Sequence, residues 1–250
     1  LAVLLCYSKI VFYNALLESE IPDMDSNNNW LFNYFPEKLR DKYKKDILNH
    51  RLRREIIATQ ITNSVLNRLG PVFIYRCMDR TGANVADVVR AYLIVRHMFD
   101  LPGLWESVEA TDNKVPAKAQ LEGFKDISSL VEYTMMWFLD RPHLMKDCDA
   151  TMSFYADGFQ QLFKVLLKIL PRDLQASLEK RTKAYEKEGF TLTLARKLAM
   201  MQNLVAAPDI IKIYKKTPLD IQGAAELYYA IGSRFSLVWL RNTARSLSSG

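Results

Sequence analysis

The chain has 250 residues, of which 49% are hydrophobic, 25% charged and 11% aromatic, a composition that excludes a disordered chain and a small disulfide-stapled scaffold. Its formal net charge is +6 at pH 7, which raises the question of an acidic partner. The three cysteines are widely spaced and form no CxxC pattern, so neither a disulfide framework nor a zinc site is expected, and a reducing, cytoplasmic location is favoured.

Apolar residues recur at helical spacing along nearly the whole chain, and runs of strict alternation rich in valine and isoleucine are missing. The nine prolines fall where these helical patterns stop or start, as suits a residue tolerated only in the first helical turn. The sequence therefore predicts an all-α fold, an irregular multi-helix domain of about ten helices with no sheet.

The first helix is expected from about Leu1 to Ser19. It is apolar apart from Lys9, and we interpret it as a buried helix rather than a signal or membrane segment. Because the sequence opens inside a helical pattern and without methionine, we expect it to be a piece of a longer protein. Further helices are expected at 30–35, 37–48, 50–69, 72–80, 84–99, 104–110, 116–139, 150–170, 171–187, 192–205, 218–231 and 236–247.

Two helix starts carry clear local signals. Asn84 is expected to cap a helix whose first turn contains Asp87. Thr217, Pro218 and Asp220 together offer a capping hydroxyl, a first-turn proline and a first-turn acid. The stretch DRPHLMKDCD at 140–149 is the best candidate for a joint, which divides the chain into helical subregions 1–140 and 141–250, the second packed on the first.

The excess charge lies in one place. The stretch 38–54 contains eight basic and two acidic residues, which accounts for the whole net charge of +6. In the helix that follows, apolar residues occupy two roughly opposite stripes, which predicts a helix running between two packed layers. Because Arg51, Arg53 and Arg54 cluster at the positive N-terminal end of this helix, they need carboxylates from elsewhere. Both an anion or acidic-domain contact and a solvated helix end remain open.

A second polar stretch, TDNKVPAKAQLEGF, runs from Thr111 to Phe124 and contains Asp112, Asn113 and Lys114. We interpret it as a corner between two helices in which polar side chains bond to the backbone, in preference to a ligand site.

Motifs that would carry chemistry are incomplete. Asp23, Asp25 and Asn27 imitate the start of a calcium loop, but its sixth and twelfth positions hold Asn28 and Tyr34 instead of glycine and glutamate. No base is identifiable for a cysteine nucleophile, no histidine has a partner at ligand spacing, and no glycine-rich phosphate loop is present. We therefore expect this segment to hold no catalytic residue, no metal and no cofactor.

Several stretches resemble a known family. HRLRREIIATQITNSVLNRLG, then TGA, then LWESVEATDNKVPAKAQL, are similar to the C-terminal helical part of the large bacterial NAD-specific glutamate dehydrogenases. The opening LAVLLCYSKI and the closing TPLDIQGAAELYYAIGSRFSLVWL resemble the same region. The resemblance covers nearly the whole chain, and it is strongest over 1–121 and weaker over 144–187.

The resemblance implies a long multidomain parent that converts L-glutamate and NAD to 2-oxoglutarate, ammonia and NADH, and that forms homo-oligomers. It places the NAD-binding domain, the catalytic residues and bound L-glutamate upstream of Leu1, and it extends the family past Gly250. Thr111 stands where an aliphatic residue is expected. The present segment would then be a non-catalytic helical domain that contacts other domains of the same chain, and no membrane is implied.

The residues proposed for such interdomain contacts are Arg51, Arg53, Arg54, Gln60, Asn63, Asn67, Asp112, Asn113 and Lys114. The alternative is an autonomous helical module that binds nucleic acid through 38–54, with Tyr34, Phe35 and Tyr43 for stacking. Nucleic acid is the less favoured partner, since no known nucleic-acid motif is present. A third possibility is a pure scaffold or oligomer contact.

Overall fold

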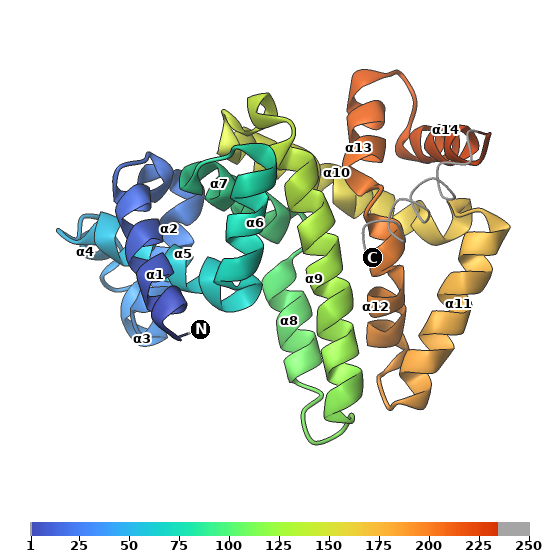
Figure 1. Cartoon of the computed structure of the whole chain (residues 1–250), viewed down its shortest axis with the longest axis horizontal. Helices are drawn as coiled ribbons and strands as arrows, with labels where there is room; N and C mark the ends of the chain where they lie inside the picture. The colour runs from blue at the N-terminus through green and yellow to red at the C-terminus, as the bar shows by residue number, and fades with distance from the viewer. Residues whose placement is uncertain (1, 235–250) are drawn as a thin grey trace. The chain divides into compact units, whose positions relative to one another are not determined.

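The computed structural model describes residues 2–234 (Figure 1). Over that range it contains fourteen α-helices, three 3₁₀ helices and no strand, which confirms the all-α prediction. The helix expected at 236–247 lies outside the described residues. Two helices add to the expected set: the pattern at 37–48 forms two short helices, and α13 was not predicted.

The elements follow one another along the chain in a single order. They are α1 (Ala2–Leu17), η1 (Ile21–Asp23), η2 (Asp25–Asn27), α2 (Asn28–Tyr34), α3 (Glu37–Arg40), α4 (Lys44–Leu48), α5 (Arg53–Leu69), α6 (Pro71–Thr81), α7 (Val85–Met98), α8 (Leu101–Glu109), α9 (Ala117–Leu139), η3 (Pro142–Met145), α10 (Cys148–Ile169), α11 (Arg172–Lys187), α12 (Leu192–Leu204), α13 (Ala207–Lys216) and α14 (Ile221–Arg234).

The described chain forms two compact units. The first consists of the residues up to His97 together with Val131–Ser153, and the second of Met98–Leu130 together with the residues from Phe154 onward. Both α9 and α10 therefore contribute residues to each unit.

Helix α5 is the central helix of the first unit. It contacts α1, α2, η1 and α6 (Figure 1). It buries one continuous face, made of Ile57, Ala58, Ile61, Thr62, Val65 and Leu66. The second predicted stripe, made of Leu52, Ile56 and Leu66, does not form a separate buried face. Leu52 precedes the helix and is 44% exposed, Ile56 is half-buried, and only Leu66 is buried, at the edge of the first face. A single buried stripe is the usual pattern of a helix packed on one side of a core.

The two predicted helix starts have different outcomes. The Asp87 amide donates to Asn84 Oδ1 at 2.9 Å, and the Asn84 amide lies 3.4 Å from Asp87 Oδ2, so the cap before α7 is confirmed. The cap assigned to Thr217 is wrong. Its hydroxyl donates backward to the Ile213 carbonyl at the end of α13, and Asp220 Oδ1 accepts from the Gly223 amide to cap α14.

The second unit is built from helix pairs, with α11 against α12 and α13 against α14 (Figure 1). Asp126 of α9 accepts hydrogen bonds from Arg181 and Tyr185 of α11. Gly158 of α10 allows a close approach to α13, because a Cβ there would lie 2.5 Å from Ile211 Cγ2. These contacts join the long helices to the later pairs within this unit.

Candidate interdomain surface

Arg54, in the first turn of α5, reaches the end of another helix. Its guanidinium donates to the carbonyls of Leu17 at 2.7 Å and Ser19 at 3.0 Å, and it forms an ion pair with Asp23. The last carbonyls of a helix have no partner within the helix and carry its negative dipole end. Arg54 is therefore unfavourably placed on its own helix and favourably placed at the end of α1.

Arg53 shares the same acid. Its guanidinium lies 3.5 Å from Asp23 Oδ1 and donates to Asn28 Oδ1 at 2.9 Å. Both arginines thus have the outside carboxylate that their position at a helix N-terminus requires, and it comes from η1 of the same unit. This acid, Asp23, lies in the incomplete calcium loop, and no local sequence pattern connects it with the two arginines.

The rest of the basic stretch is more open to solvent. Arg40 donates to the Phe35 carbonyl at 2.9 Å, whereas the remaining basic side chains are exposed. These are Lys38, Lys42, Lys44, Lys45 and Arg51, interspersed with the exposed acids Glu37, Asp41 and Asp46. The positive surface is therefore smaller than the sequence suggests, because two of its arginines are occupied.

The three predicted amides lie on one side of α5. Gln60, Asn63 and Asn67 are spaced i, i+3 and i+7, which places them within one stripe opposite the buried face. Gln60 and Asn63 are half-buried and Asn67 is exposed. Within residues 2–234 none of the three side chains makes a hydrogen bond, so their donors and acceptors are free for a partner.

The other predicted group belongs to the second unit. Asp112, Asn113 and Lys114 are exposed in the connection between α8 and α9. Asp112 Oδ1 accepts from the Asn113 amide, and Asn113 has a φ of 61°, in the left-handed region that asparagine tolerates.

Nearby side chains complete this corner. The Thr111 hydroxyl donates to the Val108 carbonyl at 2.7 Å, and Gln120 Nε2 donates to the Val115 carbonyl at 3.0 Å. The predicted corner with polar side chains bonded to the backbone is confirmed. The hydrogen bond from the Thr111 hydroxyl also explains how a polar residue is accommodated where an aliphatic one was expected.

One further charged group could not be expected from local sequence. Arg90 of α7 donates to Glu20 Oε1 through Nη2 at 2.6 Å and to Asp87 Oδ1 through Nη1 at 2.8 Å. Burial opposes ionisation of Glu20, but a backbone hydrogen bond and the Arg90 guanidinium hold the pKa of this carboxyl below its usual range. Glu20 and Arg90 lie 70 residues apart, so only the fold brings them together.

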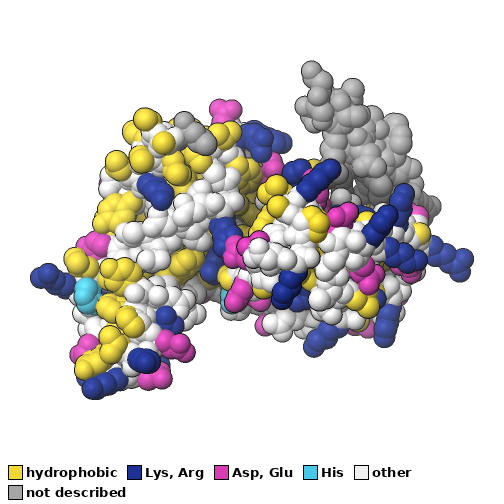
Figure 2. Space-filling view, turned by 90° about the horizontal axis from the view of Figure 1, so that it is seen from below, with side chains coloured by type: hydrophobic (Ala, Val, Ile, Leu, Met, Phe, Trp, Pro, Cys, Tyr) yellow, Lys and Arg dark blue, Asp and Glu magenta, His cyan; other side chains and the backbone are white. Residues whose placement is uncertain are grey.

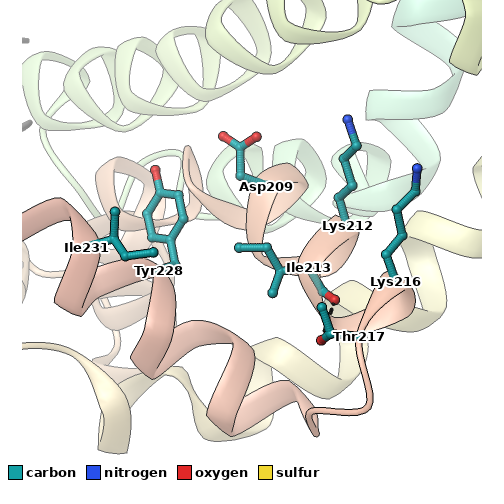
Figure 3. Close-up of a pocket in the computed structure, with 7 residues that line it drawn as sticks. All are labelled: Asp209, Lys212, Ile213, Lys216, Thr217, Tyr228 and Ile231. Atoms are coloured by element: carbon teal, nitrogen blue, oxygen red, sulfur yellow. Dashed lines mark hydrogen bonds between the residues drawn. The ribbon is translucent and has the colours of Figure 1, made fainter.

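A cavity of about 440 Å³ lies between α13 and α14 (Figure 3). In Figure 3, Tyr228 and Ile231 of α14 lie on the side toward which Ile213 points. The residues that line it are Asp209, Lys212, Ile213, Lys216, Thr217, Tyr228 and Ile231. Among these residues, the Thr217 hydroxyl donates to the Ile213 carbonyl at 2.9 Å, a bond that serves the end of α13.

The cysteines have contrasting environments. Cys6 is exposed on α1, whereas Cys77 and Cys148 are buried. Burial raises the pKa of Cys77 to about 11 and that of Cys148 to about 12, so both thiols stay protonated and unreactive at neutral pH. Over the described part of the chain, no three His, Cys, Asp or Glu side chains gather as a metal site would require, and no helix is long and apolar enough to cross a membrane.

The fold and these contacts define an all-helical domain in which arginines bond to groups of the same unit and other polar side chains lie exposed. Comparison with known proteins identifies its family. The family model for "Glutamate dehydrogenase, C-terminal" matches residues 1–250, and the chain belongs to this family.

Three relatives each carry the name NAD-specific glutamate dehydrogenase. The protein of Halomonas elongata is 36% identical over 240 residues, which is 96% of this chain and 15% of the relative. That of Pseudomonas aeruginosa is 32% identical over 239 residues, with the same coverage of 96% and 15%. That of Mycobacterium tuberculosis is 26% identical over 235 residues, covering 94% and 14%. The chain thus spans about 15% of the length of the curated relatives it matches.

The neighbouring arginines offer a matched mutational pair. Arg54→Ala removes the hydrogen bonds to the carbonyls of Leu17, the last residue of α1, and Ser19, and it leaves Asp23 with one arginine. We therefore expect the free energy of unfolding to fall by about 1–2 kcal/mol. Arg51→Ala removes the same side chain from an exposed position and should change it by less than about 0.5 kcal/mol. Urea unfolding followed by circular dichroism measures both. Equal effects of the two substitutions would contradict the role given to Arg54.

Proposed function

We propose that this chain is the C-terminal helical, non-catalytic domain of an NAD-dependent glutamate dehydrogenase. The parent enzyme would oxidatively deaminate L-glutamate to 2-oxoglutarate and ammonia, with NAD and L-glutamate bound by other domains. The match of a single family model to all 250 residues supports the assignment to such an enzyme. The relatives' greater length leaves room for a catalytic region outside the matched part.

The observation that carries the non-catalytic role is the all-helical fold. Dinucleotide-binding domains of the Rossmann type hold the pyrophosphate at the turn between a strand and a helix, in a glycine-rich loop. Residues 2–234 contain no strand, and the sequence contains no GxGxxG motif. A chain with this fold does not build that type of nucleotide site by itself.

The contact residues fall into two groups with different roles. Arg53 and Arg54 tie α5 to α1 and η1, so they hold the domain together. The exposed or half-buried residues are the better candidates for contacts with other domains of the dehydrogenase or with a second subunit of a homo-oligomer. They are Arg51, Gln60, Asn63, Asn67, Asp112, Asn113 and Lys114.

The proposal predicts a folded chain without activity. The purified 250-residue chain should show helical circular dichroism, no NADH formation with L-glutamate and NAD, and no heat of NAD binding in titration calorimetry. The longer dehydrogenase polypeptide, assayed in parallel, is the positive control. Turnover or saturable NAD binding by the 250-residue chain would overturn the non-catalytic role.

Nucleic-acid binding is the second candidate, and one observation favours it. Lys38, Lys42, Lys44 and Lys45 are exposed, and the side chains of Tyr34 and Tyr43 nearby in sequence are 55% and 41% exposed. Basic groups beside exposed aromatic rings are the combination that binds single strands. Against it, Arg53 and Arg54 are occupied by Asp23, and three exposed acids lie among the lysines.

A salt titration separates the two candidates. We expect the chain to show no more than weak binding to single-stranded or duplex DNA in fluorescence anisotropy at physiological salt. The variant in which the four exposed lysines become glutamine should behave like the parent. Tight binding that weakens steeply with salt, and that this variant loses, would instead establish phosphate contacts by the basic stretch.

A further inference from the structure

Helix α1 is mostly apolar but is buried on only one side. Its sixteen residues, AVLLCYSKIVFYNALL, include a single charged side chain, that of Lys9. The buried positions are Ser8, Phe12 and Leu16, spaced four apart on one narrow stripe. The helix therefore presents apolar side chains to solvent on its other side.

The exposed side has the spacing of a helix contact. At about 100° per residue, Val3, Cys6, Tyr7 and Ile10 fall on one stripe at i, i+3, i+4 and i+7, here called the α1 apolar face. Val3, Tyr7 and Ile10 are 84%, 62% and 61% exposed, and Cys6 is also exposed. This spacing is how a helix packs against a second helix or lies in an apolar groove.

The internal contacts of the first unit keep this face outward. Phe12 and Leu16 are fully buried, and Arg54 holds the carbonyls at the end of α1. Turning the α1 apolar face inward would expose both side chains and break these bonds. Figure 2 shows hydrophobic side chains gathered over the first unit on one face of the molecule. Exposed apolar side chains grouped on one face are a mark of interaction sites.

We propose that the α1 apolar face packs against an apolar helical surface supplied by the rest of the dehydrogenase polypeptide. The inference rests on the proposed function and names the partner of this domain. The relatives have about 85% of their length outside the matched region. A partner on the same polypeptide is held at millimolar effective concentration, whereas a second copy must offset the entropy of association. The tethered surface is therefore the favoured occupant over a second copy.

Cys6 is a native probe of this face. N-Ethylmaleimide labelling at neutral pH, read by peptide mass mapping, is compared in the 250-residue chain and in the longer dehydrogenase polypeptide. Cys77 and Cys148 are internal references, since both are buried with a raised pKa. We expect Cys6 to react readily in the 250-residue chain and at least about tenfold more slowly in the longer polypeptide.

A paired substitution identifies the cause of the protection. The variant Tyr7→Gln with Ile10→Gln adds no charge beside the thiol, so it should restore the fast reaction of Cys6 in the longer polypeptide and leave it unchanged in the 250-residue chain. Leu121→Gln, at a leucine of α9 that is 59% exposed, is the matched control and should leave Cys6 protected.

Three results would overturn the proposal. The first is equal labelling of Cys6 in both polypeptides. The second is Cys6 already protected in the 250-residue chain, whether by a second copy, which dilution would reveal, or by the chain itself. The third is protection in the longer polypeptide that survives the Tyr7 and Ile10 substitutions. None of these depends on NAD turnover by the 250-residue chain, so failure here is distinguishable from failure of the proposed function.

Discussion

The guanidinium of Arg54 is the contact on which the arrangement of the first unit depends. It joins the end of α1, the connection that follows and the start of α5 through bonds to two carbonyls and Asp23. An arginine in the first turn of a helix is repelled by the positive end of that helix's dipole. The Arg54 guanidinium, however, lies at the negative end of the α1 dipole, where its charge is stabilised. Because α1 is held there, its buried and exposed sides are both fixed.

This contact explains why the concentrated charge is a poor guide to partners. Eight basic residues in 38–54 suggest that this stretch binds an external anion. Two of them instead neutralise an acid of the same unit, and Arg40 bonds a nearby carbonyl. The surface left for partners is a mixture of lysines and acids, beside a separate stripe of amides and the apolar face of α1.

Much of the fold could be predicted because its signals are local. Helical periodicity indicates each long helix, and the pairing of Asn84 with Asp87 is read directly from a spacing of three. The prediction that Thr217 caps α14 was wrong because a threonine hydroxyl can bond to the backbone at the end of one helix as readily as at the start of the next. Only the unpredicted helix α13, ending just before Thr217, decides between these roles.

The contacts of the candidate site could be predicted less well than the fold, because the residues that interact there are distant from one another in the sequence. The dipole argument holds for Arg53 and Arg54 but not for Arg51, which precedes α5 and is exposed without a carboxylate partner among the described residues. It also could not identify Asp23, 30 residues away from Arg53. The bond between Arg90 and Glu20 spans 70 residues and has no local signal at all. The exposed side of α1 was not predicted for a different reason, namely that its local signal points to the wrong outcome. A helix that is apolar all round predicts full burial, and only the structure shows which side lacks a partner within the described chain.

The most direct test of this account is a double-mutant cycle between Arg54→Ala and Asp23→Ala, with the free energy of unfolding as the observable. If the two groups form one structural tie, the substitutions should be non-additive, with a coupling energy of about 0.5 kcal/mol or more. Glu132→Ala, which removes the ion-pair partner of Arg76 and shares no partner with Arg54, should be additive with Arg54→Ala. Strict additivity of Arg54 and Asp23 would contradict the claim that the basic stretch serves the domain itself.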